Sequence, residues 1–330
     1  MKKNFLTFIF IIIFLIYTLC GCGRTTRSLT KNGFYFDTII SITIYDSAKE
    51  YTLDHCMELA KHYENLFSPT LKGSDIWKIN HADGAPVNVD VETIFLIEKA
   101  LSYASLTDGL LNPAIAPLSS LWNFSSAATG THNVPDETDI AKKLEHTDYK
   151  KILIDGQTIR LLDAEASIDL GCIAKGYIAD KLKEYLLEEQ VESALINLGG
   201  NVVAVGNKPD NSSFTIGIQK PFAKRGISET TISVSDSSAV TSGIYERYFE
   251  QNGVLYHHIL DPKTGYPVVN ELASVTILST YSTDGDALST SCLLLGSKKG
   301  MELIESLPDI EALFITKDGT LYYSSGFPKT

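Results

Sequence analysis

Hydrophobic and polar positions follow two periods along the chain, which predict helices and strands in mixed order. Alternating β-branched and aromatic residues predict a strand from Phe34 to Tyr45, and apolar residues at helical spacing predict helices over 47–67 and 91–106. Further strands are expected over 193–198, 202–205, 214–219, 230–235, 245–249 and 255–260, with an Asp-Gly hairpin over 151–161. The polar stretch 125–136 is typical of a surface loop, and a short helix is expected over 140–144.

A tight turn that leads into a helix is expected from Asp169 to Asp180, where the chain reads Asp-Leu-Gly-Cys-Ile-Ala-Lys-Gly-Tyr-Ile-Ala-Asp. Unpaired amides at a helix N-terminus favour an anion such as phosphate, and Lys175 adds a full positive charge one turn in. By itself the stretch favours the simpler interpretation, which is a glycine-containing cap with a surface lysine.

A second stretch whose residues could bind a ligand is a predicted helix. It is expected to begin with Thr283 or Asp284 as N-cap and to end just before Gly296. Asp286 and Thr290 are four residues apart and therefore share a face of this helix. A carboxylate and a hydroxyl in this arrangement supply hard oxygen ligands, which suit Mg²⁺ and do not suit zinc. Without further evidence, an aspartate favoured by the helix dipole explains the pattern as well.

Composition describes a globular protein with ample core, because 44% of the 330 residues are hydrophobic and 21% are charged. One large domain or two small ones would fit this length. The formal net charge of −12 argues against a nucleic-acid partner, which needs clustered lysine and arginine. Three widely spaced cysteines, Cys56, Cys172 and Cys292, do not indicate a disulfide framework.

The N-terminus predicts an export signal over residues 1–21. Lys2 and Lys3 precede an apolar run that ends in Leu19-Cys-Gly-Cys22, which resembles the lipobox of bacterial lipoproteins. We therefore expect cleavage before Cys22, a lipid on its thiol, and a lipidated N-terminus and tether over 22–33. The mature chain carries 26 basic and 40 acidic residues, a net charge of −14.

Four stretches in this order resemble the ApbE family of FAD:protein FMN transferases: Asp169-Leu-Gly-Cys-Ile-Ala-Lys-Gly-Tyr, Asn197-Leu-Gly-Gly-Asn, His258-Ile-Leu-Asp-Pro-Lys-Thr-Gly and Asp286-Ala-Leu-Ser-Thr. The segments Thr107-Asp-Gly-Leu-Leu-Asn-Pro and Pro117-Leu-Ser-Ser-Leu-Trp extend the resemblance, which runs from about Phe34 to the C-terminus. Each pattern alone is common, whereas the ordered set is specific.

The resemblance implies an α+β fold, with one large domain of mixed sheets and helices over residues 34–330. It also implies that the chain binds FAD and Mg²⁺ and transfers FMN to a threonine or serine hydroxyl of a partner flavoprotein, releasing AMP. The expected partner is an exported flavoprotein with an FMN-binding domain. The expected location is the outer face of the cytoplasmic membrane, with the chain anchored by lipid.

The family's functional positions carry over to particular residues of this chain. Asp286 and Thr290 match Mg²⁺ ligands, and Cys172 falls where the family offers a backbone carbonyl. The positions that match contacts with FAD are Leu110, Leu111, Asn112, Asp169, Lys175, Arg247 and His258. Phe36 stands where other members have a methionine against the flavin, and Thr70 stands where an aromatic residue is usual.

The expected chemistry agrees with these residues. Cleavage of a pyrophosphate requires neutralised charge on the phosphoryl oxygens, which a divalent ion, Lys175 and helix-end amides supply. The acceptor hydroxyl must lose a proton, which His258 or Asp284 could take, although His258 could equally serve only to bind FAD. Two alternatives stay open: a metal-dependent FAD pyrophosphatase that yields FMN and AMP, and a flavin-binding lipoprotein without catalytic activity.

Overall fold

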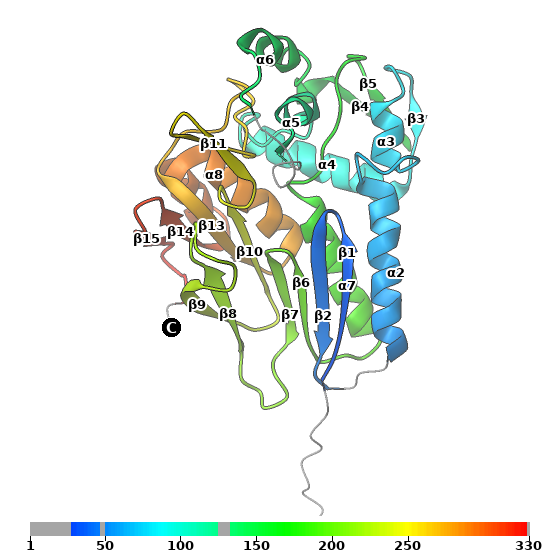
Figure 1. Ribbon diagram of the computed structural model, residues 1–330. Helices are drawn as coiled ribbons and strands as arrows, with labels where there is room; N and C mark the ends of the chain where they lie inside the picture. The colour runs from blue at the N-terminus through cyan, green and yellow to red at the C-terminus, as the bar shows by residue number, and fades with distance from the viewer. Residues whose placement is uncertain (1–27, 47–49, 125–132, 329–330) are drawn as a thin grey trace, which may run out of the picture.

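An antiparallel sheet of eight strands is the framework of the computed structural model, which describes residues 28–46, 50–124 and 133–328 (Figure 1). The strands lie in the order β1-β2-β6-β7-β10-β13-β14-β15, and every pair of neighbours is antiparallel. Their bounds are β1 Leu29–Tyr35, β2 Thr38–Ile44, β6 Ser193–Leu198, β7 Asn201–Gly206, β10 Ser238–Gly243, β13 Leu272–Ser279, β14 Glu311–Thr316 and β15 Leu321–Tyr323.

Three long helices, α2 (Glu50–Phe67), α7 (Ala174–Glu188) and α8 (Ser282–Glu305), pack against one face of this sheet. Their apolar stripes meet the inward side chains of the strands and form the main hydrophobic core, in which Ile42 and Leu293 are fully buried. Helices α7 and α8 also contact each other, which places the start of each helix beside the other.

The opposite face of the sheet is covered by a hairpin of β8 (Phe214–Gln219) and β9 (Ser228–Val234). Phe214 and Ile232 of this hairpin pack with Leu313 of β14 in a second, smaller core. Because both faces are covered, strands such as β13 and β14 are buried on nearly every residue.

Shorter elements gather at one end of the sheet, at the top of Figure 1. They are α3 Asp75–Asn80, β3 Val87–Asn88, α4 Val91–Leu106, α5 Ala116–Trp122, α6 Glu137–Leu144, the 3₁₀ helix η2 Tyr149–Lys151, β4 Ile152–Asp155 and β5 Thr158–Leu161. The helix expected over 91–106 has the predicted bounds because Asp90 caps it, accepting the Glu92 amide at 2.8 Å. The expected hairpin over 151–161 is β4–β5.

A hairpin of β11 (Tyr248–Gln251) and β12 (Val254–His257) is joined to α5 through aromatic rings. Trp122 stacks on Phe124 at 5.6 Å and on Tyr256 at 5.7 Å, and its Nε1 donates to the Gly265 carbonyl at 2.8 Å. The strand expected over 245–249 begins later than predicted, since residues 244–247 form the turn that precedes β11.

The single strand expected from Phe34 to Tyr45 is two strands. Phe36 and Asp37 adopt left-handed backbone conformations, with φ of 51° and 56°, and close a two-residue turn between β1 and β2. Residues 29–33, which we expected to belong to the tether over 22–33, already pair with β2. Three of them, Thr30, Lys31 and Asn32, are polar, which suits an edge strand with one face exposed to solvent.

Helix α8 departs from the prediction at both ends. It begins at Ser282, with Tyr281 in the cap position and no capping side chain of its own, rather than with Thr283 or Asp284 as N-cap. Gly296 leaves the helical conformation as expected, with φ of 78°, yet a second helical segment follows to Glu305. A glycine kink in this position is one of the common causes of a sharp bend.

The α+β fold implied by the sequence is confirmed by this arrangement of antiparallel sheets and packed helices. The three cysteines of the described chain, Cys56, Cys172 and Cys292, are free thiols. Within the described residues, no helix combines the length and apolar composition needed to cross a membrane. The predicted signal peptide and Cys22 lie outside the described residues, as does most of the expected loop over 125–136.

Candidate active site

The carboxylate of Asp286 connects the two stretches that the sequence singled out. Its Oδ2 accepts the backbone N–H of Gly176 at 2.9 Å, and its Oδ1 lies 3.5 Å from the Lys175 ammonium. Asp286 is buried, with 2% of its surface exposed. Because Gly176 is the third residue of α7, its amide has no partner within the helix, so Asp286 of α8 caps the N-terminus of α7.

The absence of a side chain at Gly176 permits this contact. A Cβ atom there would lie 2.3 Å from the Ser282 carbonyl oxygen and 2.7 Å from the Thr283 Cα, both of which are backbone atoms. The two helices therefore approach more closely than any other residue would allow. This explains why a glycine follows Lys175 in the motif.

The turn before α7 is held by Asp169. Its Oδ1 accepts the Gly171 amide at 2.8 Å, and its own amide donates to the Pro113 carbonyl at 2.9 Å. Ser119 of α5 lies 3.5 Å from Asp169 Oδ2. Asp169 thus links its turn to the Asn112-Pro113 segment and to α5, three of the stretches that the sequence grouped together.

Lys175 shows that this cluster of oxygens accepts a cation. Its ammonium lies 3.3 Å from the Gly171 carbonyl oxygen and 3.5 Å from Asp286 Oδ1. About a quarter of the side chain, 26%, is exposed, so the ammonium borders the solvent. A positive charge between a carbonyl and a carboxylate occupies the kind of environment that a hard divalent ion prefers.

Thr290 and Cys172 flank Asp286. The Thr290 hydroxyl lies 3.3 Å from Ser242 Oγ, which also lies 2.8 Å from Ser289 Oγ. Burial, followed by the negative charges of Asp169 and Asp286, raises the pKa of the Cys172 thiol to about 12. The thiol is therefore neutral at physiological pH, which leaves the backbone carbonyl of Cys172 as its hard oxygen donor.

The donor set fits Mg²⁺ better than a soft metal. Among the described residues, no group of three or more histidine, cysteine, aspartate or glutamate side chains could hold a metal ion. The candidate ligands are one carboxylate and neutral oxygens, which are Asp286, the Thr290 hydroxyl and the Cys172 carbonyl. Mg²⁺ is usually bound through one or two carboxylates, with water and substrate phosphates completing its shell.

His258 follows β12 and contacts the backbone of Arg247. Its amide donates to the Arg247 carbonyl at 3.1 Å, and its Nδ1 lies 3.3 Å from the same oxygen. Desolvation, followed by the positive charge of Arg247, lowers the pKa of His258 to about 3, and the Lys175 charge acts in the same direction.

Asp284, the other candidate base, belongs to a different contact. Its Oδ1 accepts a hydrogen bond from the Tyr103 hydroxyl at 2.6 Å and pairs with the Lys99 ammonium at 2.9 Å, both from α4. Burial, followed by the bond to Asp284, raises the pKa of Tyr103. The carboxylate of Asp284 is thus engaged with α4, whereas that of Asp286 faces α7.

The segment Leu110 to Asn112 is held by core packing and by hydrogen bonds of its side chains within the protein. Leu111 is buried in the core, and Asn112 donates from Nδ2 to the Thr147 carbonyl at 2.7 Å and accepts the Ala114 amide at 2.8 Å. The side chains of Leu111 and Asn112 are therefore committed within the protein, so contacts to a ligand from these two positions would come from backbone atoms. Leu110 is half-buried and packs against the core.

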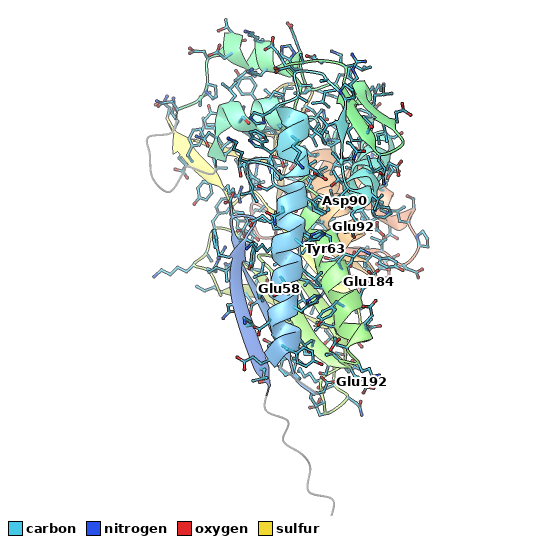
Figure 2. All side chains as sticks on the ribbon, turned by 90° about the vertical axis from the view of Figure 1, so that its right-hand side faces the viewer. Glu58, Tyr63, Asp90, Glu92, Glu184 and Glu192 are labelled. Atoms are coloured by element: carbon cyan, nitrogen blue, oxygen red, sulfur yellow. The ribbon has the colours of Figure 1, made fainter. Side chains whose placement is uncertain are left out.

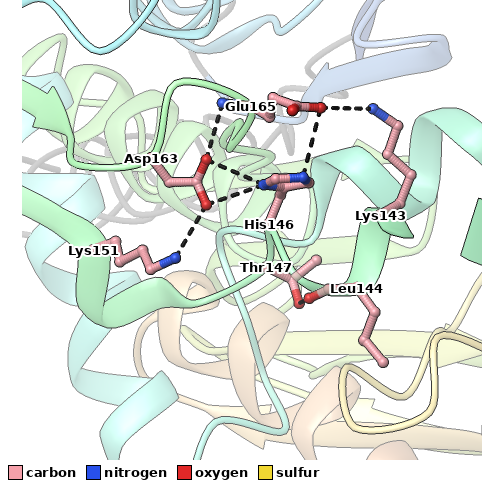
Figure 3. Close-up of polar contacts among 7 residues, drawn as sticks. All are labelled: Lys143, Leu144, His146, Thr147, Lys151, Asp163 and Glu165. Atoms are coloured by element: carbon pink, nitrogen blue, oxygen red, sulfur yellow. Dashed lines mark hydrogen bonds and ion pairs between the residues drawn. The ribbon is translucent and has the colours of Figure 1, made fainter. Parts of the chain in front are cut away.

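A charged network around Asp163 lies next to Thr147, whose carbonyl accepts the Asn112 side chain (Figure 3). His146 Nδ1 lies 3.1 Å from both carboxylate oxygens of Asp163, and the Lys151 ammonium lies 3.1 Å from Asp163 Oδ2. Burial opposes ionisation of Asp163, but the hydrogen bonds from His146 and Lys151 lower its pKa to about 2. The network anchors the backbone that carries the Thr147 carbonyl.

Phe36 and Thr70 lie near the ends of β1 and α2. The Phe36 amide donates to Glu64 Oε1 of α2 at 2.8 Å, and its ring packs against the main core. Thr70 is exposed, and its hydroxyl lies 3.3 Å from Ser68 Oγ. Thr70 therefore offers a small polar side chain at the end of α2.

Residues 36–314 match the model of the ApbE family. The chain belongs to the ApbE family. The FAD:protein FMN transferase of Klebsiella pneumoniae (strain 342) is 43% identical over 271 residues, which cover 81% of this chain and 83% of that protein. The FAD:protein FMN transferase of Treponema pallidum (strain Nichols) is 34% identical and covers 94% of this chain and 92% of its own length.

Solved structures of ApbE proteins share the fold. An ApbE protein from Thermotoga maritima superposes with a TM-score of 0.82 at 32% identity, covering 91% of this chain and 97% of that one. The flavin transferase ApbE from Vibrio cholerae gives a TM-score of 0.81 at 28% identity, with 91% and 98% covered. The family resemblance drawn from the ordered motifs is therefore confirmed, as is the expectation that this ApbE chain is an enzyme, a transferase.

Several residues around the site were not predicted from the sequence. Lys99, Tyr103 and Ser242 were missed because their partners are distant in the chain. Asp180 closes the Asp169 motif, and its position four residues after Gly176 was a signal that the prediction did not use. Its carboxylate accepts the amides of Ser282 and Thr283 at the start of α8.

Proposed function

We propose that this ApbE protein transfers the FMN part of FAD to a threonine or serine hydroxyl of an exported flavoprotein, in a Mg²⁺-dependent reaction that releases AMP. The observation that carries the proposal is the meeting of the buried Asp286 carboxylate with Lys175 and the N-terminus of α7. This arrangement unites an acidic ligand for a cation with positive charge for a diphosphate.

The diphosphate of FAD would lie between Lys175 and Arg247. Both charges and the amides at the start of α7 lower the energy of the developing negative charge on the phosphoryl oxygens. Asp286, the Thr290 hydroxyl and the Cys172 carbonyl would hold the metal. Bound Mg²⁺ supplies charge neutralisation on the diphosphate, as in other phosphoryl transfers.

In the transfer step the hydroxyl oxygen of the acceptor forms a bond to the phosphorus of the FMN half. The bond from that phosphorus to the bridging oxygen breaks, and AMP departs with the bridging oxygen and its electron pair. Lys175 offers an ammonium to the departing phosphate. Because the transition state of such reactions is loose, positioning and electrostatics contribute more than covalent chemistry from the protein.

His258 would take the proton of the acceptor hydroxyl through Nε2. Its Nδ1 faces the Arg247 carbonyl at 3.3 Å, so a proton on Nδ1 donates there and leaves the lone pair on Nε2. The low pKa of His258, about 3, keeps this imidazole neutral at physiological pH. The negative diphosphate of bound FAD favours the imidazolium that forms when the proton arrives.

The flavin ring would lie toward Phe36 and Thr70, next to the backbone of Leu110 to Asn112. Phe36 replaces an unbranched methionine with a flat ring, which stacks on an aromatic ligand with its face or edge. Thr70 cannot stack. The flavin should therefore be held by fewer aromatic contacts than in members that have an aromatic residue at this position.

We further propose that the mature chain is exported and anchored by lipid at Cys22 on the outer face of the cytoplasmic membrane. The Leu19-Cys-Gly-Cys22 ending supports this location. A shared membrane would raise the concentration of the enzyme near its acceptor. A stable anchor requires more than one acyl chain, which bacterial lipoproteins carry. A Cys22→Ala variant should appear in the medium rather than in the membrane fraction.

A single incubation separates the proposed function from its alternatives. Purified protein is mixed with FAD, Mg²⁺ and a purified FMN-binding domain, and the products are followed on a denaturing gel and by chromatography of free nucleotides. Flavin fluorescence that stays on the acceptor supports transfer. Free FMN and AMP without a labelled acceptor would indicate a pyrophosphatase, and intact FAD would indicate a binding protein.

A further inference from the structure

Asp180 ends the motif that begins at Asp169, and its carboxylate reaches the start of α8. It accepts three hydrogen bonds there: the Ser282 amide at 2.7 Å, the Thr283 amide at 2.8 Å and the Thr283 hydroxyl at 2.6 Å. The helix has no capping side chain of its own. Its first amides, which no carbonyl within α8 can satisfy, are therefore satisfied by a carboxylate from α7.

The contact mirrors that of Asp286. Asp286 of α8 caps the N-terminus of α7 through the Gly176 amide at 2.9 Å, while Asp180 of α7 caps the N-terminus of α8. Gly176 and Asp180 are one helical turn apart, and so are Ser282 and Asp286. The four residues therefore form a rectangle of contacts, in which a carboxylate from each helix accepts hydrogen bonds from amides in the first turn of the other helix.

The position of the Asp286 carboxylate depends on this rectangle. Oδ2 is used by Gly176, which leaves Oδ1 near the Lys175 ammonium. Close contact at Gly176, where a Cβ would lie 2.3 Å from the Ser282 carbonyl oxygen, leaves no room for the helices to shift inward. The three bonds of Asp180 oppose a shift of the α8 N-terminus outward along the same line, and they act at the first residues of the helix, one turn before the Asp286–Gly176 bond.

We propose that Asp180 is a positioning residue for the transfer reaction: by tying the first turn of α8 to α7, it fixes the Asp286 carboxylate where a divalent ion is bound. The inference rests on the proposed function. Asp180 itself touches neither metal nor substrate, and acts through the placement of Asp286. A displacement of about 1 Å at a catalytic group is sufficient to lower a rate by about two orders of magnitude.

An ordinary helix cap makes a different prediction. Loss of a cap costs stability, about 1 kcal/mol, and leaves the affinity of the folded molecule for a ligand unchanged. Loss of a residue that orients a metal ligand lowers metal affinity about 10- to 100-fold in the molecules that are still folded. Metal affinity measured below the melting temperature therefore separates the two roles.

The test uses Asp180→Asn, which keeps the volume of the side chain but loses the charge and one acceptor oxygen, and Thr283→Val, which removes one of the three bonds. Glu184→Gln is the matched control, because Glu184 is an exposed carboxylate on the same helix (Figure 2). For each full-length protein, binding of Mn²⁺ in the absence of FAD is measured by electron paramagnetic resonance. Thermal unfolding and the Mg²⁺ concentration for half-maximal labelling are measured in parallel.

We expect Asp180→Asn to bind Mn²⁺ about tenfold or more weakly and to require correspondingly more Mg²⁺, with part of the rate restored at high Mg²⁺. Thr283→Val should show a smaller change in the same direction, and it keeps the test valid if Asp180→Asn does not fold. Mn²⁺ affinity within twofold of the wild type in a folded variant, together with a lower melting temperature, would reduce Asp180 to a structural cap.

The outcome for Asp180 is distinguishable from the outcome for the proposed function. If the wild type binds Mn²⁺ and labels no acceptor, the proposed transfer fails while the effect of Asp180 on the metal site can still be measured. If the wild type binds no Mn²⁺ and its activity is independent of Mg²⁺, the positioning role of Asp180 is refuted with the metal site itself.

Discussion

The Asp286 carboxylate of α8 caps the N-terminus of α7 through the Gly176 amide, at 2.9 Å, although the two residues are 110 positions apart in the chain. Helix N-termini attract anions, and here the anion is a side chain with one oxygen still available. A diphosphate and a cation would meet at this same point. The contact therefore places a carboxylate, the Lys175 ammonium and the positive end of the helix dipole within one small volume.

Replacement of Gly176 by alanine should separate the two helices. Its Cβ would lie 2.3 Å from a backbone oxygen and 2.6 Å from a backbone carbon of Ser282, neither of which can rotate away. We expect a loss of about 1–3 kcal/mol in the free energy of unfolding, and a larger fractional loss of transfer activity. Chemical denaturation and labelling rates measure both effects, with Glu188→Ala on the exposed side of α7 as control. Wild-type stability in the variant would show that the helices are not in tight contact.

The pH dependence of transfer should lack an ordinary histidine ionisation. The pKa of His258 is lowered to about 3, so the imidazole is neutral above about pH 4 and its lone pair is available throughout the physiological range. We expect kcat/KM, which reports the free enzyme, to stay flat from pH 8 down to pH 6. A fall with an apparent pKa near 6.5 that disappears in His258→Gln would contradict the assigned environment of His258.

Asp284 and His258 can be distinguished as candidate bases by substitution. The Asp284 carboxylate is engaged by Lys99 at 2.9 Å and Tyr103 at 2.6 Å, so Asp284→Asn should retain transfer within about tenfold. His258→Ala removes the proposed general base and should lower kcat about 100-fold or more. Single-turnover labelling rates at saturating FAD provide the comparison. The opposite ranking of the two variants would assign the base to Asp284.

The network of His146, Lys151 and Asp163 should stabilise the fold in a pH-dependent manner. The pKa of Asp163 is lowered from an ordinary 3.8 to about 2, so its contribution to stability is complete above about pH 4 and is lost as pH falls through 2. We expect Asp163→Asn to lose about 2 kcal/mol of unfolding free energy at pH 7. Urea denaturation at pH 7 and at lower pH should show the gap between variant and wild type narrowing. Asp139→Asn, on the exposed face of α6, controls for a lost surface charge; a gap of constant size at every pH would refute the role of ionised Asp163.

Local signals in the sequence were sufficient for much of the secondary structure. Asp90 caps α4 with its own side chain, and the helix was predicted with its observed bounds. The turn at Phe36 and Asp37 was missed because neither residue is the glycine or asparagine that usually marks a left-handed turn, and the alternation of apolar residues continues through it. The start of α8 was misplaced because the carboxylate that caps it, Asp180, comes from another helix.

The candidate site shows the same division between local and distant information. Asp286, Thr290 and the Asp169 turn were identified from spacing and family resemblance, because the motif residues are contiguous. Which partners surround them could not be predicted, since Lys99 and Tyr103 reach Asp284 from about 180 residues away in the chain. The sequence suggested Asp286 as a metal ligand and Asp284 as a candidate base near the metal. The structure adds that the Asp286 carboxylate contacts α7, whereas the Asp284 carboxylate contacts α4.

The most direct measurement compares AMP release with acceptor labelling in the wild type and in Asp286→Asn. Both proteins, checked by circular dichroism for an intact fold, are incubated with FAD, Mg²⁺ and an FMN-binding domain, and the reactions are stopped with a chelator. We expect the wild type to release one AMP for each acceptor labelled with FMN, and the variant to lose about 100-fold or more in both. Labelling by Asp286→Asn at the wild-type rate, or labelling that does not require Mg²⁺, would contradict the central role of the Asp286 site.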